Sequence, residues 1–75
     1  MQRYFFDLVN PTRAEYDYRG REMSSAVQAQ ALAELIAIDE STRADRIGWS
    51  VKVSDARGKT YFSVPVCELP ELAAA

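Results

Sequence analysis

Few residues in this chain of 75 residues could carry out chemistry. The chain contains no histidine, the side chain that most often transfers protons near neutral pH. Its one cysteine, Cys67, lies between Val66 and Glu68, so no basic neighbour is present to activate the thiol. We therefore expect Cys67 to be chemically inert, and a single cysteine cannot form an internal disulfide.

Three acidic residues near the N-terminus, Asp7, Glu15 and Asp17, could gather at one end of a hairpin. Their spacing matches no metal-binding loop, and starting a turn is a sufficient role for Asp17. No glycine-rich segment suited to hold phosphate is present. The sequence thus predicts a protein that is not an enzyme and that has no metal or other cofactor.

The elements that position these residues begin with a strand over residues 3–9, in which apolar side chains occupy both faces. A turn at residues 10–12 leads into a short antiparallel strand over residues 14–18. Residues 21–23 either extend that strand or lead into the helix. Three adjacent aromatic residues in the first strand indicate a central strand whose second face also needs an explanation.

A helix is predicted over residues 26–44, with Ser24 and Ser25 suited to cap its first turn. Arg43 and Arg46 follow near the negative end of the helix dipole, and Gly48 stops the segment. On a helical wheel the larger apolar side chains share one arc, which we expect to pack on the sheet. This arc contains Val27, Ala31, Leu32, Leu35, Ile36 and Ile38.

The last third of the chain alternates apolar and polar residues as a hairpin does. Placing Val51 opposite Phe62 and Val53 opposite Thr60 leaves residues 55–58 as a four-residue loop. The alternative is a three-residue loop with a bulge, which would turn Tyr61 toward the interior. The alternation favours the four-residue loop.

Together the elements predict an α+β fold: a small ββαββ domain over residues 1–68, in which one helix packs on one face of an antiparallel four-stranded sheet. Residues 69–75 are expected to form a frayed tail. One helix covers only one face of such a sheet, so the other face is open. We expect an interaction surface there, formed by Phe5, Asp7, Lys52 and Tyr61.

Size and charge favour a protein partner for this surface. The core of so short a chain is small, and neither disulfide nor metal supplements it, so a homodimer or a small protein partner is expected. The alternative is a single-stranded nucleic-acid binder, in which Phe5 and Tyr61 stack on bases while Arg3, Lys52 and Lys59 meet phosphates. Nine basic and eleven acidic residues give a net charge of −2, which counts against it.

The unpaired thiol is typical of a reducing cytoplasm. No apolar stretch is long enough to span a membrane, and the N-terminus runs directly into a strand pattern rather than a signal peptide. We therefore expect a cytoplasmic protein that does not associate with membranes.

Several motifs in fixed order resemble a family of short bacterial proteins of unknown function. They are Arg3-Tyr4-Phe5-Phe6-Asp7-Leu8, Asp17 and Gly20 followed by Glu22, an alanine-rich helix, Trp49-x-Val51-x-Val53-x-Asp55-x-x-Gly58, and Val64-Pro65. The resemblance implies a small cytoplasmic bacterial domain without an established activity, and it transfers no catalytic or binding residue. The pair Ser24-Ser25 departs from the family's usual helix start. A narrower likeness, over residues 17–38, is to antitoxin partners of small bacterial RNA-cleaving toxins, which implies an antitoxin-like regulator as another alternative.

Overall fold

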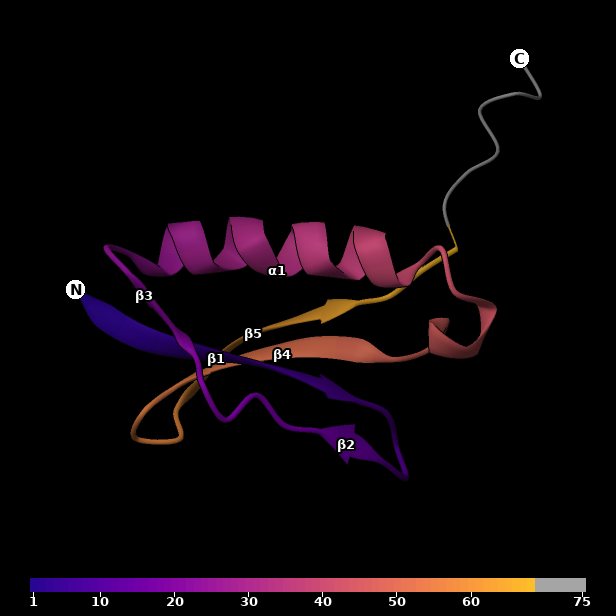
Figure 1. The fold of residues 1–75 in the computed structure, drawn as a ribbon, viewed down its shortest axis with the longest axis horizontal. Coiled ribbons are helices and arrows are strands. Elements are labelled where there is room, and N and C mark those ends of the chain that lie inside the picture. The colour runs from indigo at the N-terminus through magenta and orange to yellow at the C-terminus, as the bar shows by residue number, and fades with distance from the viewer. Residues whose placement is uncertain (69–75) are drawn as a thin grey trace, which may run out of the picture.

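A single helix lies across one face of an antiparallel sheet in the computed structural model, which describes residues 1–68 (Figure 1). The elements in chain order are β1 (Gln2–Val9), β2 (Ala14–Glu15), β3 (Arg21–Met23), α1 (Ala26–Glu40), the short 3₁₀ turn η1 (Ala44–Arg46), β4 (Ser50–Asp55) and β5 (Thr60–Pro65). They confirm the predicted α+β class and ββαββ order. The predicted tail, residues 69–75, lies outside the described residues.

The sheet has the order β2-β1-β4-β5, and β3 also pairs with β1. The predicted second strand is therefore divided: β2 pairs with the end of β1, where Leu8 lies opposite Glu15, and β3 pairs with its start, where Gln2 lies opposite Met23. The prediction of one strand over residues 14–18 was wrong, because the chain leaves β1 after Glu15 and returns at Arg21.

The β4–β5 hairpin contains a β-bulge, as in the alternative that the alternation of apolar and polar residues had not favoured. Val51 pairs with Val64 and Val53 with Phe62, and a register shift follows that leaves Tyr61 as the extra residue. The amide of Gly58 donates to the Asp55 carbonyl at 3.0 Å, with Gly58 in the left-handed region at a φ of 85°. A tight turn followed by a left-handed glycine is the usual geometry of a three-residue loop. The predicted four-residue loop was therefore wrong. The observed pairing is shifted by two residues along β5 from the predicted one, and because side chains alternate with a period of two, every valine stays on its predicted face.

The helix is shorter than predicted, because it ends at Glu40 instead of residue 44. Ser25 caps its first turn by accepting the amide hydrogen of Gln28, as expected of a serine at this position. At the other end, the hydroxyl of Thr42 donates to the Asp39 carbonyl at 2.8 Å, and the hydroxyl of Ser41 also donates to a helix carbonyl. These side chains satisfy carbonyls that a further turn would have used.

The helix packs on the sheet through alanines, contrary to the predicted apolar arc. Ala29, Ala33 and Ala37 belong to the buried core. The rest of that core is Tyr4, Trp49, Val51, Val53 and Val66. The sheet supplies the large side chains, so the helix has to present small ones in order to approach it. Consequently most of the predicted arc faces away from the sheet.

Candidate functional site

The structure places three of the four predicted interaction residues on one face of the sheet. Asp7 of β1 lies directly opposite Lys52 of β4, and Phe5 lies opposite Ser54. These side chains alternate with Tyr4 and Phe6, which lie on the helix side with the core. Lys52 is exposed, whereas Phe5 and Asp7 are half-buried.

Tyr61 lies on the opposite face, so the prediction of its position was wrong. Its ring meets that of Tyr4 edge-on, with 5.6 Å between the centroids, and its hydroxyl donates to Asp55 Oδ2 at 3.1 Å. The β-bulge is the cause, because one extra residue reverses the side on which the next side chain lies. Phe5 and Tyr61 therefore cannot form one apolar surface.

Asp55, which closes this hairpin, is held as a carboxylate. Burial opposes its charge, but the amides of Lys59 and Arg57 and the hydroxyl of Tyr61 outweigh burial, so the pKa of Asp55 lies below its usual value. Both amides donate to Oδ1, at 3.0 and 2.8 Å. The group therefore shapes the loop, as expected from the turn pattern.

The half-burial of Phe5 results from the segment between β2 and β3. Gly20 lies so close that a Cβ there would be 2.9 Å from Phe5 Cε2 and from the Tyr4 carbonyl oxygen. Its φ of 72° is also one that glycine adopts far more readily than other residues. The backbone at Gly20 thus covers part of the aromatic ring that sequence reasoning left open.

Asp7 and Asp17 both accept backbone amide hydrogens where the segment between β2 and β3 meets β1. Asp7 Oδ1 accepts the Asp17 amide at 2.9 Å, while the Asp17 carboxylate accepts the amides of Phe6, Arg19 and Gly20 at 3.0–3.2 Å. Burial opposes the charge of Asp17, but these three amides outweigh it, so the pKa of Asp17 lies below its usual value. Asp17 replaces strand hydrogen bonds where β2 has ended and β3 has not begun.

Asp17→Ala should lower the free energy of unfolding by about 1–3 kcal/mol at neutral pH, because it leaves amides without their charged acceptor. A carboxylate with a lowered folded pKa stabilises the fold above its unfolded pKa, near 3.8, and loses this effect as the pH falls through the folded value. Urea unfolding from pH 7 to pH 2.5 should therefore show the gap between wild type and variant narrowing below about pH 4. The exposed Glu22→Gln change is the control, and a gap that stays constant with pH would contradict this role.

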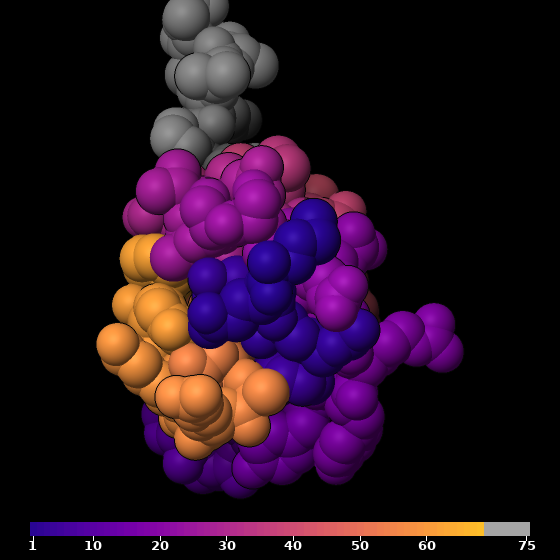
Figure 2. All heavy atoms as spheres, turned by 90° about the vertical axis from the view of Figure 1, so that its left-hand side faces the viewer, coloured from indigo at the N-terminus to yellow at the C-terminus, as the bar shows by residue number. Residues whose placement is uncertain are grey.

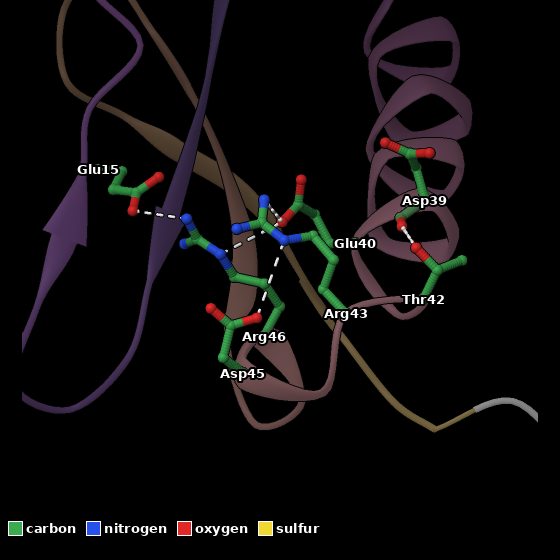
Figure 3. Close-up of polar contacts among 7 residues, drawn as sticks. All are labelled: Glu15, Asp39, Glu40, Thr42, Arg43, Asp45 and Arg46. Carbon is green, nitrogen blue, oxygen red and sulfur yellow. Dashed lines mark hydrogen bonds and ion pairs between the residues drawn. The ribbon is translucent and has the colours of Figure 1, made fainter.

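The end of α1 is joined to β2 by an arginine (Figure 3). Arg46 Nη2 donates to Glu15 Oε2 at 2.7 Å, and its Nε lies 3.4 Å from Glu40 Oε1. Its guanidinium carbon lies 4.5 Å from the centroid of the Trp49 ring. The hydrogen bond to Glu15 raises the pKa of Arg46 above its usual value. The predicted place of Arg46 near the helix end holds, and the side chain serves to fix Trp49 and β2 together.

Exposed apolar side chains gather on the outer face of α1, defined by Val27, Ala31, Leu35 and Ile38. The three large side chains are 75%, 63% and 50% exposed, for Val27, Leu35 and Ile38 respectively. At 100° per residue they lie opposite the alanines that contact the sheet. Figure 2, viewed from the end where the helix begins, shows α1 as the ridge of the molecule above the orange and yellow β4–β5 hairpin.

An open groove of about 250 Å³ runs beside this outer face, between α1 and β5. Its lining residues are Glu34, Ala37, Ile38, Val64, Pro65 and Cys67. Ile38 belongs to both features, so the groove continues the outer face of α1 toward the sheet edge. Cys67 is exposed there.

Within residues 1–68, no group of histidine, cysteine, aspartate or glutamate residues is arranged to hold a metal ion. No helix among the described residues is long and apolar enough to cross a membrane.

Residues 3–67 match a family described as a domain of unknown function, DUF6894. The chain belongs to this family. No match was found among curated proteins or among solved structures. The description of the DUF6894 family names no activity, so the function of this DUF6894 domain has to be argued from its own geometry.

Sequence reasoning missed the outer face of α1 although a signal for it is present. Ala29, Ala33 and Ala37 recur every four residues, which places them on one side of a helix. Small residues at such spacing indicate a helix that approaches its neighbour closely. The helical wheel predicted that the arc of larger apolar residues packs on the sheet. In this DUF6894 domain Ile36 of that arc does pack against the core, whereas Val27, Leu35 and Ile38 are exposed.

Proposed function

We propose that this DUF6894 domain acts by binding another protein through the outer face of α1, and that it is not an enzyme. The observation that carries the proposal is a helix with two apolar sides, of which only the alanine side is covered by described residues. A helix that is apolar all round is normally buried all round. Exposed apolar patches on small domains usually mark interaction surfaces.

Burial of the outer face would add appreciably to the stability of so small a domain. Each large aliphatic side chain contributes about 1.5–3 kcal/mol when it moves from full exposure to full burial. Val27, Leu35 and Ile38 begin at least half exposed, so most of that contribution is still available in the free chain. The predicted open-sheet surface offers less apolar area, because Tyr61 lies on the other face of the sheet and Phe5 is partly covered.

The geometry bears differently on the two alternative functions. It argues against single-stranded nucleic-acid binding, because Phe5 and Tyr61 lie on opposite faces and cannot stack on successive bases of one strand. An antitoxin-like regulator would be one case of the proposed function, since an antitoxin acts by binding its toxin. A bacterial, cytoplasmic setting remains part of the proposal, supported by the sequence motifs and the single thiol.

A photo-reactive benzophenone amino acid at position 35 should form a covalent protein adduct when cells that express the chain are irradiated. The matched control carries the same group at position 18, where Tyr18 is 88% exposed and lies outside α1, in the segment between β2 and β3. Adding Ile38→Glu to the position-35 variant should abolish the adduct. Equal adducts from both positions, or none from position 35, would contradict the proposal.

A further inference from the structure

We propose that the partner is a second copy of this chain, docked outer face to outer face with the two α1 helices antiparallel. The two-fold axis would pass near the boundary between Leu32 and Ala33. This inference rests on the proposed function and names the occupant of the surface. Three features of α1 support it: an uncompensated dipole, the polar rims of the outer face, and the sizes of its apolar residues.

The dipole of α1 is compensated at neither end by its own side chains. No acidic residue lies in its first turn and no basic residue in its last turn. Its acidic residues, Glu34, Asp39 and Glu40, all lie in the C-terminal half, at the negative end of the dipole. An antiparallel copy would place the acidic half of each helix beside the N-terminal half of the other. That half carries the positive end of the dipole and no charged side chain.

The polar residues on the two rims of the outer face repeat this asymmetry. One rim carries Gln30 and then Glu34, and the other carries Gln28 and then Asp39, at 100° per residue. A two-fold axis perpendicular to α1 brings each rim against the same rim of the copy, running in the opposite direction. Glu34 then faces Gln30 and Asp39 faces Gln28, so both carboxylates on the rims meet an amide donor.

The donor of Gln28 is available for this contact. Its Oε1 accepts both the amide of Ser24, at 3.1 Å, and the hydroxyl of Ser24, at 2.8 Å. Because the oxygen is engaged, the NH₂ group is the part of the side chain left to donate.

The apolar residues fit the same register. Val27 lies opposite Ile38, and Ala31 lies opposite Leu35, so that a small residue meets a large one at the centre of the contact. In these two apolar pairs and in the two polar pairs on the rims, the two residues lie at about equal distances on either side of the proposed axis. A parallel arrangement would instead bring the acidic halves together, with Glu34 beside Asp39, and leave the two dipoles aligned unfavourably.

The expected dimer is weak. Standard interfaces bury about 800 Å² per partner, and three large side chains on a helix about 22 Å long provide less than a standard core. We therefore expect a dissociation constant on the order of tens of micromolar. Sedimentation velocity from about 1 to 500 µM should show a change from one chain to two across that range.

Leu35→Glu should weaken this dimer on the order of 30-fold or more, because it places a fourth acidic residue in the acidic half and removes a central apolar contact. Tyr18→Glu is the matched control, and it should leave the association unchanged. Gln28→Lys should tighten the dimer by placing a cation opposite Asp39. An unchanged mass distribution in Leu35→Glu, or a weaker dimer in Gln28→Lys, would overturn the proposal.

Disulfide capture tests the orientation in the Cys67→Ser background. Chains carrying Val27→Cys and chains carrying Ile38→Cys should cross-link when mixed and should not cross-link with themselves. Self-linking of each variant would show a parallel pair and overturn the proposal. A monomer at every concentration, without any cross-link, would also overturn it. If the chain is monomeric, a photo-adduct at position 35 whose mass differs from that of two chains would still support the proposed function. The absence of any adduct would contradict both the proposed function and the dimer.

Discussion

Trp49→Ala should lower the free energy of unfolding by about 3–5 kcal/mol, comparable to the whole stability expected of a domain of this size. Trp49 is 8% exposed, belongs to the buried core and carries the Arg46 guanidinium 4.5 Å from its ring centroid. Removal of the indole therefore leaves a cavity beneath α1 and frees the arginine that joins β2 to the helix end. Urea unfolding followed by far-ultraviolet circular dichroism measures the loss.

Tyr18→Ala is the matched aromatic control for this change. Tyr18 is 88% exposed, so its removal should change the free energy of unfolding by less than about 0.5 kcal/mol. If Trp49→Ala unfolded at the same urea concentration as Tyr18→Ala, the ring would not be part of the core, and the described junction between α1, η1 and β4 would be wrong.

Ala33→Leu should lower the free energy of unfolding by about 2–3 kcal/mol, whereas Leu35→Ala should change it by less than about 1 kcal/mol. Ala33 is fully buried against the sheet, so three added carbons have to displace either the helix or Val51 and Val53. Leu35 is 63% exposed and leaves no internal cavity when shortened. Thermal unfolding at a protein concentration near 1 µM, roughly below the expected dissociation constant, keeps dimerisation from contributing.

The reverse order of effects is what the predicted apolar arc would give. Had Leu35 been core, its truncation would cost about 2–5 kcal/mol, and Ala33→Leu would lie on the surface with little effect. The pair therefore separates the two rotations of the helix about its own axis.

The order of elements and the central position of β1 could be predicted from the sequence, because alternation and capping are local signals. The bulge at Tyr61 could not, since a shift of two residues leaves Val51, Val53 and Phe62 on the same face and only Tyr61 changes side. The division into β2 and β3 depends on Asp17 accepting the amide of Phe6, a contact across eleven residues that no pattern in a single strand indicates.

The candidate site was only partly predictable for a related reason. Alternation correctly placed Phe5, Asp7 and Lys52 on one face of the sheet, but it gives no information on what covers them. The cover at Phe5 depends on Gly20 in a left-handed conformation. On α1, the wheel correctly grouped Val27, Leu35 and Ile38, yet a wheel cannot say which of two apolar sides meets the sheet.

Both proposals depend on the claim that the alanine side of α1 faces the sheet. Nuclear Overhauser spectra of methyl-labelled protein near 20 µM, roughly within the range of the expected equilibrium, measure it directly. We expect contacts from the Ala29, Ala33 and Ala37 methyls to those of Val51 and Val53 within one chain. Mixed-label samples should place the Leu35 methyls near Ala31 of another chain, and nowhere near the valines of β4. Contacts from Leu35 to Val51 or Val53 within one chain would contradict this orientation of α1 on the sheet.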